Sequence, residues 1–485
     1  MAVEHPRRSR HGPMTTPSIR VALATLLVTL LILTSVTVRR RDGDPYDPTL
    51  SESAWNIAPF QVVGAEGLID PGAFRRMAVS ADLFHGIVPQ HVALRIGYYA
   101  MIAWGSVALL WVIYLWVIWR ARTRPVGLRT VVGGAVALSL LALTIPPIFS
   151  TDSFGYAIYG RIAADYGANP YTTSPASTAV GDPLMPYVYW RDLASPYGPI
   201  WTLISKGLVL DPATPVEVAM RFKLLALTAT LLNGWLIYAL VRRQWPDQAR
   251  WAYLAFAWNP LVLVEGIVAA HNDAVMLTVV LLAAHLVVRT RGELSIVALT
   301  VAGLVKVTIA PIAGIAALRL LVRTPLANRF AVAGRLIVSS AVVTLCAVAP
   351  FWCGADLLGG LLSQPENGVN NPISIAFAGI ASNLPARAHV LGTPMALVAI
   401  ALVLLAAWEV RCLRRLDMDI GERSIYGELA HWATSLSMLL LVFPRVYTWY
   451  FLVPLGLAIA AGPAHRGAFN VILSLALVSY VTYFQ

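Results

Sequence analysis

Residues 131–149 read VVGGAVALSLLALTIPPIF and are followed at once by the polar segment STDSFGYAIYGRIAADYG, residues 150–167. The apolar run carries no charge and is long enough to cross the hydrocarbon core of a bilayer as a helix. Asp152 is separated from the end of that run by two residues. A carboxylate at a membrane surface is costly unless it has a partner or a chemical role. Asp152 is therefore either a solvated acid at a helix end or a candidate catalytic acid.

Composition extends this conclusion to the whole chain. Its 485 residues are 58% hydrophobic and 13% charged, with a mean hydropathy of +0.68, whereas soluble domains are about 25% charged. Backbone polar groups in lipid need partners within their own segment, so the apolar spans are helices. We therefore predict an all-α polytopic membrane protein with about eleven to thirteen transmembrane helices. The clearest spans are Val21–Val38, Ile102–Trp119, Val131–Phe149, Leu224–Leu240, Ser339–Trp352 and Met395–Trp408.

Arginine placement predicts the orientation of the chain. The net charge of +11 does not indicate nucleic-acid binding, because the arginines gather in short connectors between apolar spans. Loops of this kind face the cytoplasm. They are Arg120–Arg129, Arg242–Arg250, Arg289–Arg291, Arg319–Arg329 and Arg411–Arg415, and Arg39–Arg41 is the exception. Asp152 lies one crossing away from the first connector, so we expect it on the extracytoplasmic side of the plasma membrane.

These patterns divide the chain into four expected parts. Residues 1–18 form a cytoplasmic tail, and residues 19–149 form the first transmembrane helices with an outer segment at 39–93. Residues 150–199 form an extracytoplasmic catalytic loop, and residues 200–485 supply the remaining helices and the donor-binding loops. We interpret Val21–Val38 as a membrane anchor because no clear cleavage site follows it.

Smaller features add further expectations. Ala73–Phe84 is typical of an amphipathic piece in the outer segment, and residues 200–210 are too short to span comfortably. Helix breaks are expected at Trp258–Pro260 and near Lys306. The three cysteines, Cys346, Cys353 and Cys412, are too few and scattered to indicate a disulfide framework or a metal site.

Polar residues recur at the expected outer face. Glu265 is followed by His271-Asn272-Asp273, which open the next apolar run. Lys306 stands inside an apolar run, where a lysine costs about 2.5–3.5 kcal/mol unless it snorkels, has a partner or faces water. Lys306 is thus either a structural amine or a ligand-binding one. Arg445 opens an aromatic patch that also fits an interfacial belt.

Together these groups favour a transferase that uses a lipid-linked phosphosugar. Cations at membrane level suit a phosphate, aromatic rings suit a sugar face or a lipid tail, and a carboxylate suits a general base. Two alternatives stay open. A transporter or flippase of a lipid-linked sugar would be expected to show internal symmetry, and none is visible. A glycan ligase would share the fold and the phosphate site.

Five blocks carry a resemblance to a known family. They are TDSFGYAIYGRIAADYGANPYTT (151–173), SPYGPIW (195–201), WNPLVLVEGIVAAHNDAVML (258–277), VAGLVKVTIAPI (301–312) and FPRVYTWYFLVPL (443–455). They resemble polyprenol-phosphomannose-dependent mannosyltransferases of the GT-C fold, similar to the α-1,6-mannosyltransferases of lipomannan assembly. The resemblance implies that Asp152 is the catalytic base of an inverting transfer that gives an α-glycoside. The acid follows the third apolar helix and is single, whereas many GT-C enzymes carry it after the first and some relatives have a pair.

The expected site follows from the residue types and the resemblance. Asp152 is the expected catalytic residue, and the expected phosphate ligands are Lys306, His271, Arg445 and Arg161. Expected substrate contacts are Tyr156, Tyr197, Asn272, Asp273, Tyr447 and Trp449. The implied partners are membrane lipid, a polyprenyl-phosphate sugar donor and a glycan or glycolipid acceptor, with no nucleic acid, no metal and no cofactor besides the donor. The sequence leaves the sugar and the acceptor open.

Overall fold

The computed structural model describes residues 17–38, 90–145, 147, 150–210, 214–362, 371, 375–376, 379–380, 394–414, 422–443 and 445–480. All regular elements in these ranges are helical, and none of them is a strand. The predicted all-α fold is therefore confirmed. The amphipathic piece expected at Ala73–Phe84 lies outside the described residues.

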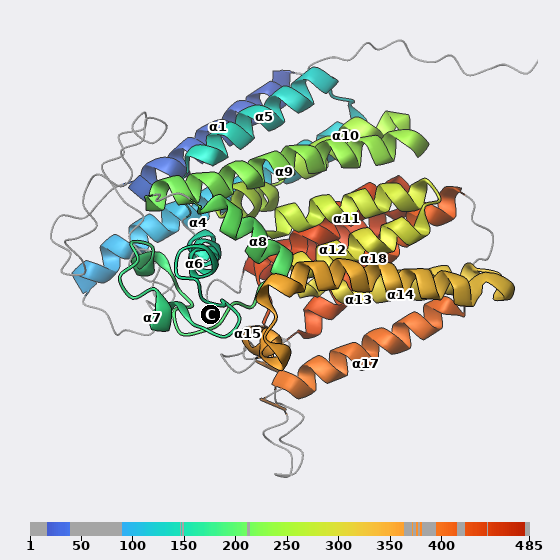
Figure 1. Cartoon of the computed structure of the whole chain (residues 1–485). Helices are drawn as coiled ribbons and strands as arrows, with labels where there is room; N and C mark the ends of the chain where they lie inside the picture. Colours follow the sequence, from blue (N-terminus) through green and yellow to red (C-terminus); the bar gives the residue numbers. More distant parts are fainter. Residues whose placement is uncertain are drawn as a thin grey trace, which may run out of the picture.

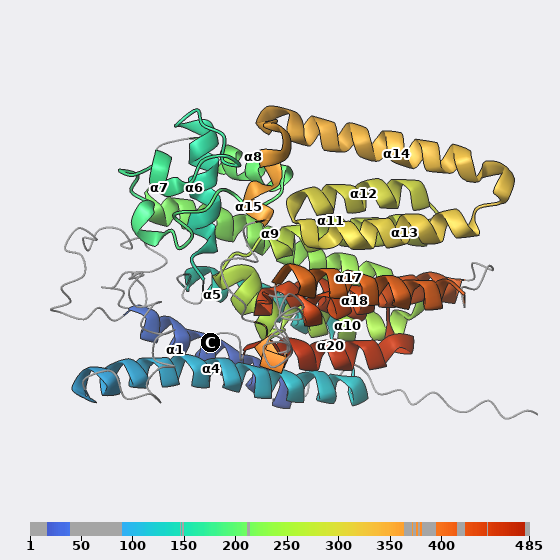
Figure 2. The same ribbon diagram turned by 90° about the horizontal axis from the view of Figure 1, so that it is seen from below.

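The long helices lie roughly side by side, and α6 and α7 gather at one end of the bundle (Figure 1, Figure 2). The first half contains α1 (Pro17–Val38), α4 (Gln90–Thr123), α5 (Leu128–Thr144), α6 (Asp152–Ala164), α7 (Pro175–Thr178), α8 (Pro199–Leu208), α9 (Pro215–Gln244) and α10 (Ala249–Ala257). The second half contains a π-helix (Val262–Val268), α11 (Asp273–Val288), α12 (Gly292–Val305), α13 (Ala310–Arg323), α14 (Leu326–Val348), α15 (Gly359–Leu362), α17 (Pro394–Leu413), α18 (Glu422–Val442), α19 (Leu452–Ala460) and α20 (Arg466–Val478).

Several of these helices have the length and composition of membrane spans. Four pass on both criteria, and a bent pair brings the number to five in the described part of the chain. Shorter apolar helices accompany them, such as α5, α11 and α12. The chain is thus a polytopic membrane protein, and the count of eleven to thirteen crossings stays a prediction.

Both expected helix breaks are confirmed. α10 ends at Ala257, and the π-helix continues from it at an angle of 57° after Asn259-Pro260. Proline lacks the N–H that a continuous helix would need, so the break falls there. The second break lies at Lys306, whose backbone is extended (φ −151°, ψ 124°) between α12 and the short 3₁₀ turn that leads to α13.

Two boundaries differ from the sequence-based expectation. α5 ends at Thr144 instead of reaching Phe149, because Pro146 and Pro147 cannot continue it. The segment 150–199 is not irregular throughout, since it begins with the thirteen-residue helix α6. Asp152 stands in the first turn of α6, where an acidic side chain is favoured by the helix dipole.

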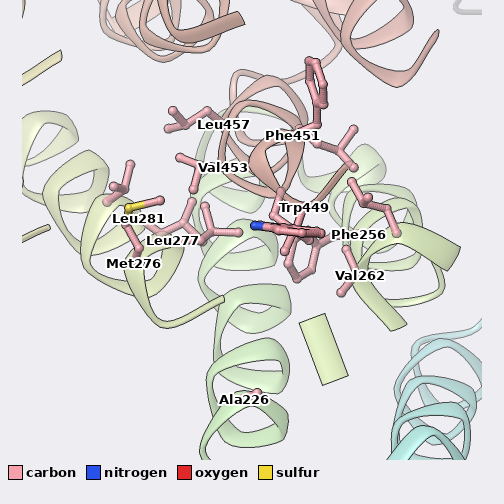
Figure 3. Packing of buried hydrophobic residues seen from close by; sticks show 14 of the residues in the cluster. Ala226, Phe256, Val262, Met276, Leu277, Leu281, Trp449, Phe451, Val453 and Leu457 are labelled. Atoms are coloured by element: carbon pink, nitrogen blue, oxygen red, sulfur yellow. The ribbon is translucent and has the colours of Figure 1, made fainter. Parts of the chain in front are cut away.

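A buried aromatic residue, Trp449, lies in the core of the bundle. Figure 3 shows Trp449 in the same buried cluster as Phe256, Val262, Leu277 and Val453. Only 7% of Trp449 is exposed. α10, the π-helix, α11 and α19 thus all contribute to the buried cluster that holds Trp449, just before α19.

Candidate active site

The site begins at the first turn of α6. The Asp152 side chain keeps 16% of its surface exposed, while its neighbours in the site are more deeply buried. Tyr156, one turn further on, donates its hydroxyl to Oδ2 of Asp152 at 3.5 Å and accepts the backbone N–H of Asn272 at 3.3 Å. α6 is thereby joined to the turn that carries His271-Asn272-Asp273.

His271 lies between two carboxylates. Its Nδ1 is 3.5 Å from Oδ2 of Asp152, and its Nε2 is 3.4 Å from Oε2 of Glu265. These are ion-pair distances, because neither ring nitrogen makes a well-aligned hydrogen bond. His271 and Glu265 are fully buried. Asp152, His271 and Glu265 thus form an acid–imidazole–acid row whose Asp152 end reaches the surface.

The backbone that carries Glu265 and His271 has an unusual conformation. Glu265 stands in the middle of the π-helix, a geometry frequently found at functional sites. Ala270, directly before His271, has φ = 55°, in the left-handed region that non-glycine residues rarely adopt. Such a residue costs about 1–3 kcal/mol and persists only where its surroundings hold it. The fold therefore holds His271 at some cost in stability.

The charge state of His271 follows from these neighbours. Burial alone lowers the pKa of His271, but the carboxylates of Asp152 and Glu265 outweigh it and raise the pKa above the ordinary value. The imidazolium form is thereby favoured beside Asp152.

Aromatic rings cover the other side of the imidazole. The His271 ring stacks on Trp449 with centroids 3.8 Å apart, and Trp449 stacks on Tyr447 at 4.4 Å. Tyr450 meets Tyr447 edge-on at 5.7 Å. Tyr197 packs edge-on against Tyr156 at 4.8 Å. The expected substrate-contacting aromatics therefore lie around the acid–imidazole–acid row.

Lys306 has a partner in the structure. Its ammonium is 2.7 Å from Oδ2 of Asp273, whose side chain is 1% exposed, and 4.1 Å from the centre of the Tyr450 ring. The Lys306 side chain is 11% exposed. The structure thus supports the interpretation of Lys306 as a structurally paired amine, because it shows the partner. The phosphate role of Lys306 stays a prediction.

Arg445 stands at the rim of the same group. Its guanidinium lies 5.0 Å from the centre of the Trp190 ring. Burial raises the pKa of Tyr447 to about 12, while the Arg445 charge opposes the increase and the Asp152 charge adds to it. The charges of Arg445 and Asp152 therefore both influence the Tyr447 hydroxyl, in opposite directions.

Arg161 is engaged elsewhere. It lies nine residues beyond Asp152 on α6, and its guanidinium is 2.8 Å from Oδ1 of Asp182. Asp182 also accepts the Tyr166 hydroxyl at 3.1 Å and the Leu184 N–H at 2.8 Å. Arg161 thus secures the loop after α6, and the structure does not bring it into the group around His271.

Sequence reasoning left three neighbours out of the expected site. Glu265 contacts His271, Tyr450 contacts Lys306, and Trp190 contacts Arg445. Glu265 carried a signal, because an isolated acid in an apolar run indicates function. Trp190 carried none. In the described ranges no group of three His, Cys, Asp or Glu side chains could hold a metal ion, and the expected metal independence stays a prediction.

Comparisons with known proteins point to one family. Residues 63–323 match a family described as "Alpha-(1->6)-mannopyranosyltransferase, N-terminal domain". The chain is 31% identical over 147 residues to a probable alpha-(1->6)-mannopyranosyltransferase of Mycolicibacterium smegmatis, covering 29% of this chain and 25% of that protein. It is 26% identical over 407 residues to alpha-(1->6)-mannopyranosyltransferase B of Corynebacterium glutamicum, covering 75% of this chain and 63% of that protein.

The extent of these matches differs between relatives. The chain spans about a quarter of the length of two mycobacterial relatives that it matches. No solved structure matches it.

Proposed function

The chain belongs to the alpha-(1->6)-mannopyranosyltransferase family, and on that premise we propose that it transfers mannose from a polyprenyl-phosphate donor to a glycan hydroxyl. The acceptor in this proposal is a lipid-linked or cell-envelope glycan on the extracytoplasmic side. The observation that carries the proposal is the acid–imidazole–acid row, which places a partly exposed carboxylate at the start of α6. The surrounding tyrosines and tryptophans suit a sugar face.

The proposed reaction is an inverting displacement with Asp152 as general base. Asp152 takes the proton of the acceptor hydroxyl while that oxygen bonds to the anomeric carbon of a β-linked donor. The bond between that carbon and the phosphate oxygen breaks at the same time. Polyprenyl phosphate leaves with the electron pair, and the product is an α-glycoside.

His271 orients the base in this scheme. Its positive charge attracts the Asp152 carboxylate, and Glu265 holds the imidazole from the opposite edge. The stacked Trp449 ring restricts tilting of the imidazole. A general base held in one orientation is more effective than a mobile one, because the reacting atoms must be aligned.

The leaving phosphate needs positive charge. Arg445, Lys306 and His271 are the proposed sources, and such stabilisation in a dry site is worth several kcal/mol. Lys306 already contacts Asp273, so a phosphate would share its ammonium with that carboxylate. Arg445 lies over the face of the Trp190 ring, and its planar guanidinium is suited to a phosphate. Arg161, held by Asp182, supports the loop in this scheme.

Substitution of Asp152 tests the proposal. Purified protein is incubated with polyprenyl phosphomannose and other polyprenyl phosphosugars, and the glycan products are analysed. Asp152→Asn should lower turnover by about 10²–10⁴-fold with donor binding retained, because an amide cannot accept the proton. Asp165→Asn is the matched control, since Asp165 lies just beyond α6 with 47% of its side chain exposed.

Three outcomes would contradict the proposal. Near-normal turnover of Asp152→Asn would remove Asp152 from the role of base. Transfer of a different sugar by the parent protein would show that mannose is not the transferred sugar. A parent protein that moves the donor across a vesicle membrane without forming a glycoside would favour the transporter alternative.

A further inference from the structure

Lys223 is a fully buried lysine in the N-terminal third of α9. Its contacts in the described part of the chain are four backbone carbonyls rather than carboxylates. The ammonium lies 3.3 Å from the oxygen of Ala142, 2.7 Å from Ile145, 3.2 Å from Ile267 and 2.9 Å from Val268. A buried ammonium is costly unless its N–H groups find acceptors, and here the acceptors all belong to the backbone.

These carbonyls belong to two helix ends. Ala142 and Ile145 close α5, and Ile267 and Val268 close the π-helix. Carbonyls at a helix C-terminus lack partners within the helix and carry partial negative charge. One ammonium therefore serves both ends at once and sets the distance between them.

Each of these ends is followed in the chain by a residue of the acid–imidazole–acid row. Asp152 follows Ile145 by seven positions, and His271 follows Val268 by three. We infer that Lys223 is a positioning residue, which sets the separation of Asp152 and His271 by joining the C-terminal ends of α5 and the π-helix. The inference rests on the proposed function only in naming Asp152 as the base.

The burial of Lys223 excludes the usual role of a lysine in a membrane protein. Ionisable residues at membrane level commonly face a substrate or an aqueous cavity. Lys223 has 0% of its surface exposed, and four acceptors surround its ammonium. Its effect on transfer must therefore pass through the two helix ends. A displacement of about 1 Å at a reacting group costs on the order of 10²-fold in rate.

The test compares three variants with the parent. Lys223→Met keeps the length of the side chain and removes all donors, and Lys223→Gln restores an N–H₂ group on a shorter stem. Lys206→Met, on the partly exposed α8, is the matched control for loss of a lysine charge. Hydrogen exchange is measured in peptides that contain Asp152 or His271, together with kcat and KM for transfer.

We expect Lys223→Met to accelerate exchange in those two regions and to lower kcat by about 10–10²-fold with little change in KM. Lys223→Gln should recover part of kcat, and Lys206→Met should match the parent. Parental kcat in the folded Lys223→Met protein would overturn the inference, as would exchange that rises evenly along the chain. If Lys223→Met does not fold, Lys223→Gln must show the same local exchange and kcat loss in milder form, and parental values would overturn the inference. Absence of transfer by the parent would refute the proposed function, while the exchange comparison would still decide the role of Lys223.

Discussion

The buried basic side chains His271 and Lys306 each lie beside carboxylates that compensate their charge. His271 has a carboxylate at each ring nitrogen, and Lys306 has Asp273. Breaking a buried pair typically costs about 3–5 kcal/mol, because the remaining charge is left without compensation. Substitutions here therefore change both stability and chemistry, and a useful test has to separate the two.

The pH dependence of transfer should report His271. Its pKa is raised, so the imidazolium persists to higher pH than in a free histidine and is lost as pH rises through the folded-state pKa. The rate should therefore fall on the alkaline side of that pKa. Glu265→Gln removes one of the carboxylates that raise the pKa and should move this alkaline limb to lower pH. Glu293→Gln, which removes a partly exposed acid paired with Arg335, is the control and should leave the profile unchanged.

An alkaline limb that is identical in Glu265→Gln and in the parent would contradict this assignment. The limb would then belong to another group, and His271 would not act on Asp152 through its charge.

Lys306 needs a paired substitution. The sequence alone predicts that Lys306→Met keeps the protein folded, but the structure places the buried Asp273 carboxylate on the ammonium. We therefore expect Lys306→Met to lower the free energy of unfolding by about 3–5 kcal/mol. Adding Asp273→Asn should restore much of the loss, because it removes the uncompensated charge. Thermal melting in detergent measures both effects.

Donor binding to the Lys306→Met/Asp273→Asn protein, measured against Asp273→Asn alone because Asp273 is itself an expected substrate contact, then isolates the phosphate role. Weak binding by this folded variant supports Lys306 as a phosphate ligand. Parental binding would show that the Lys306 ammonium serves only to compensate Asp273.

Among the helices, the sequence predicted the breaks that depend on the residue at the break itself. Pro260 and Lys306 indicated the two breaks, and both are present. The start of α6 at Asp152 was missed because a polar aromatic segment after an apolar run resembles a loop. The π-helix could not be predicted, because the apolar pattern around Glu265 does not distinguish a π-helix from an α-helix and the contacts of its end with Lys223 come from a distant helix. Asp152 was found from sequence, whereas its pairing with His271 required the fold.

Contact between α8 and α12 depends on one glycine. The Gly198 N–H donates to the Val305 carbonyl at 3.1 Å, and a Cβ at Gly198 would collide with the Leu304 carbonyl oxygen. Gly198→Ala should therefore cost about 1–3 kcal/mol and displace the backbone next to Lys306. Gly207→Ala, in the same α8 with open space around it, should be neutral or stabilising by up to about 1 kcal/mol. Equal melting temperatures for the two variants would contradict this account of the junction.

Across the whole bundle, the two ends carry different groups of polar residues. α6 and α7 lie at one end, and the connection from α9 to α10, with its arginines, lies at the other (Figure 1). The acid–imidazole–acid row belongs to the first end. This arrangement fits the sequence-based expectation that arginine-rich connectors and the Asp152 segment face opposite sides of a membrane.

Labelling of single cysteines tests this sidedness. In a background with Cys346, Cys353 and Cys412 replaced by serine, Val180→Cys marks the α7 end, where Val180 is 76% exposed. Asp247→Cys marks the exposed connection between α9 and α10. An impermeant maleimide added to intact cells should label Val180→Cys, and Asp247→Cys should react only after the membrane is opened, because arginine-rich connectors stay in the cytoplasm. Labelling of both positions from outside would place the two ends on one side. Asp152 and the arginine-rich connectors would then face the same side of the bilayer, which would contradict the proposed reaction on an extracytoplasmic glycan.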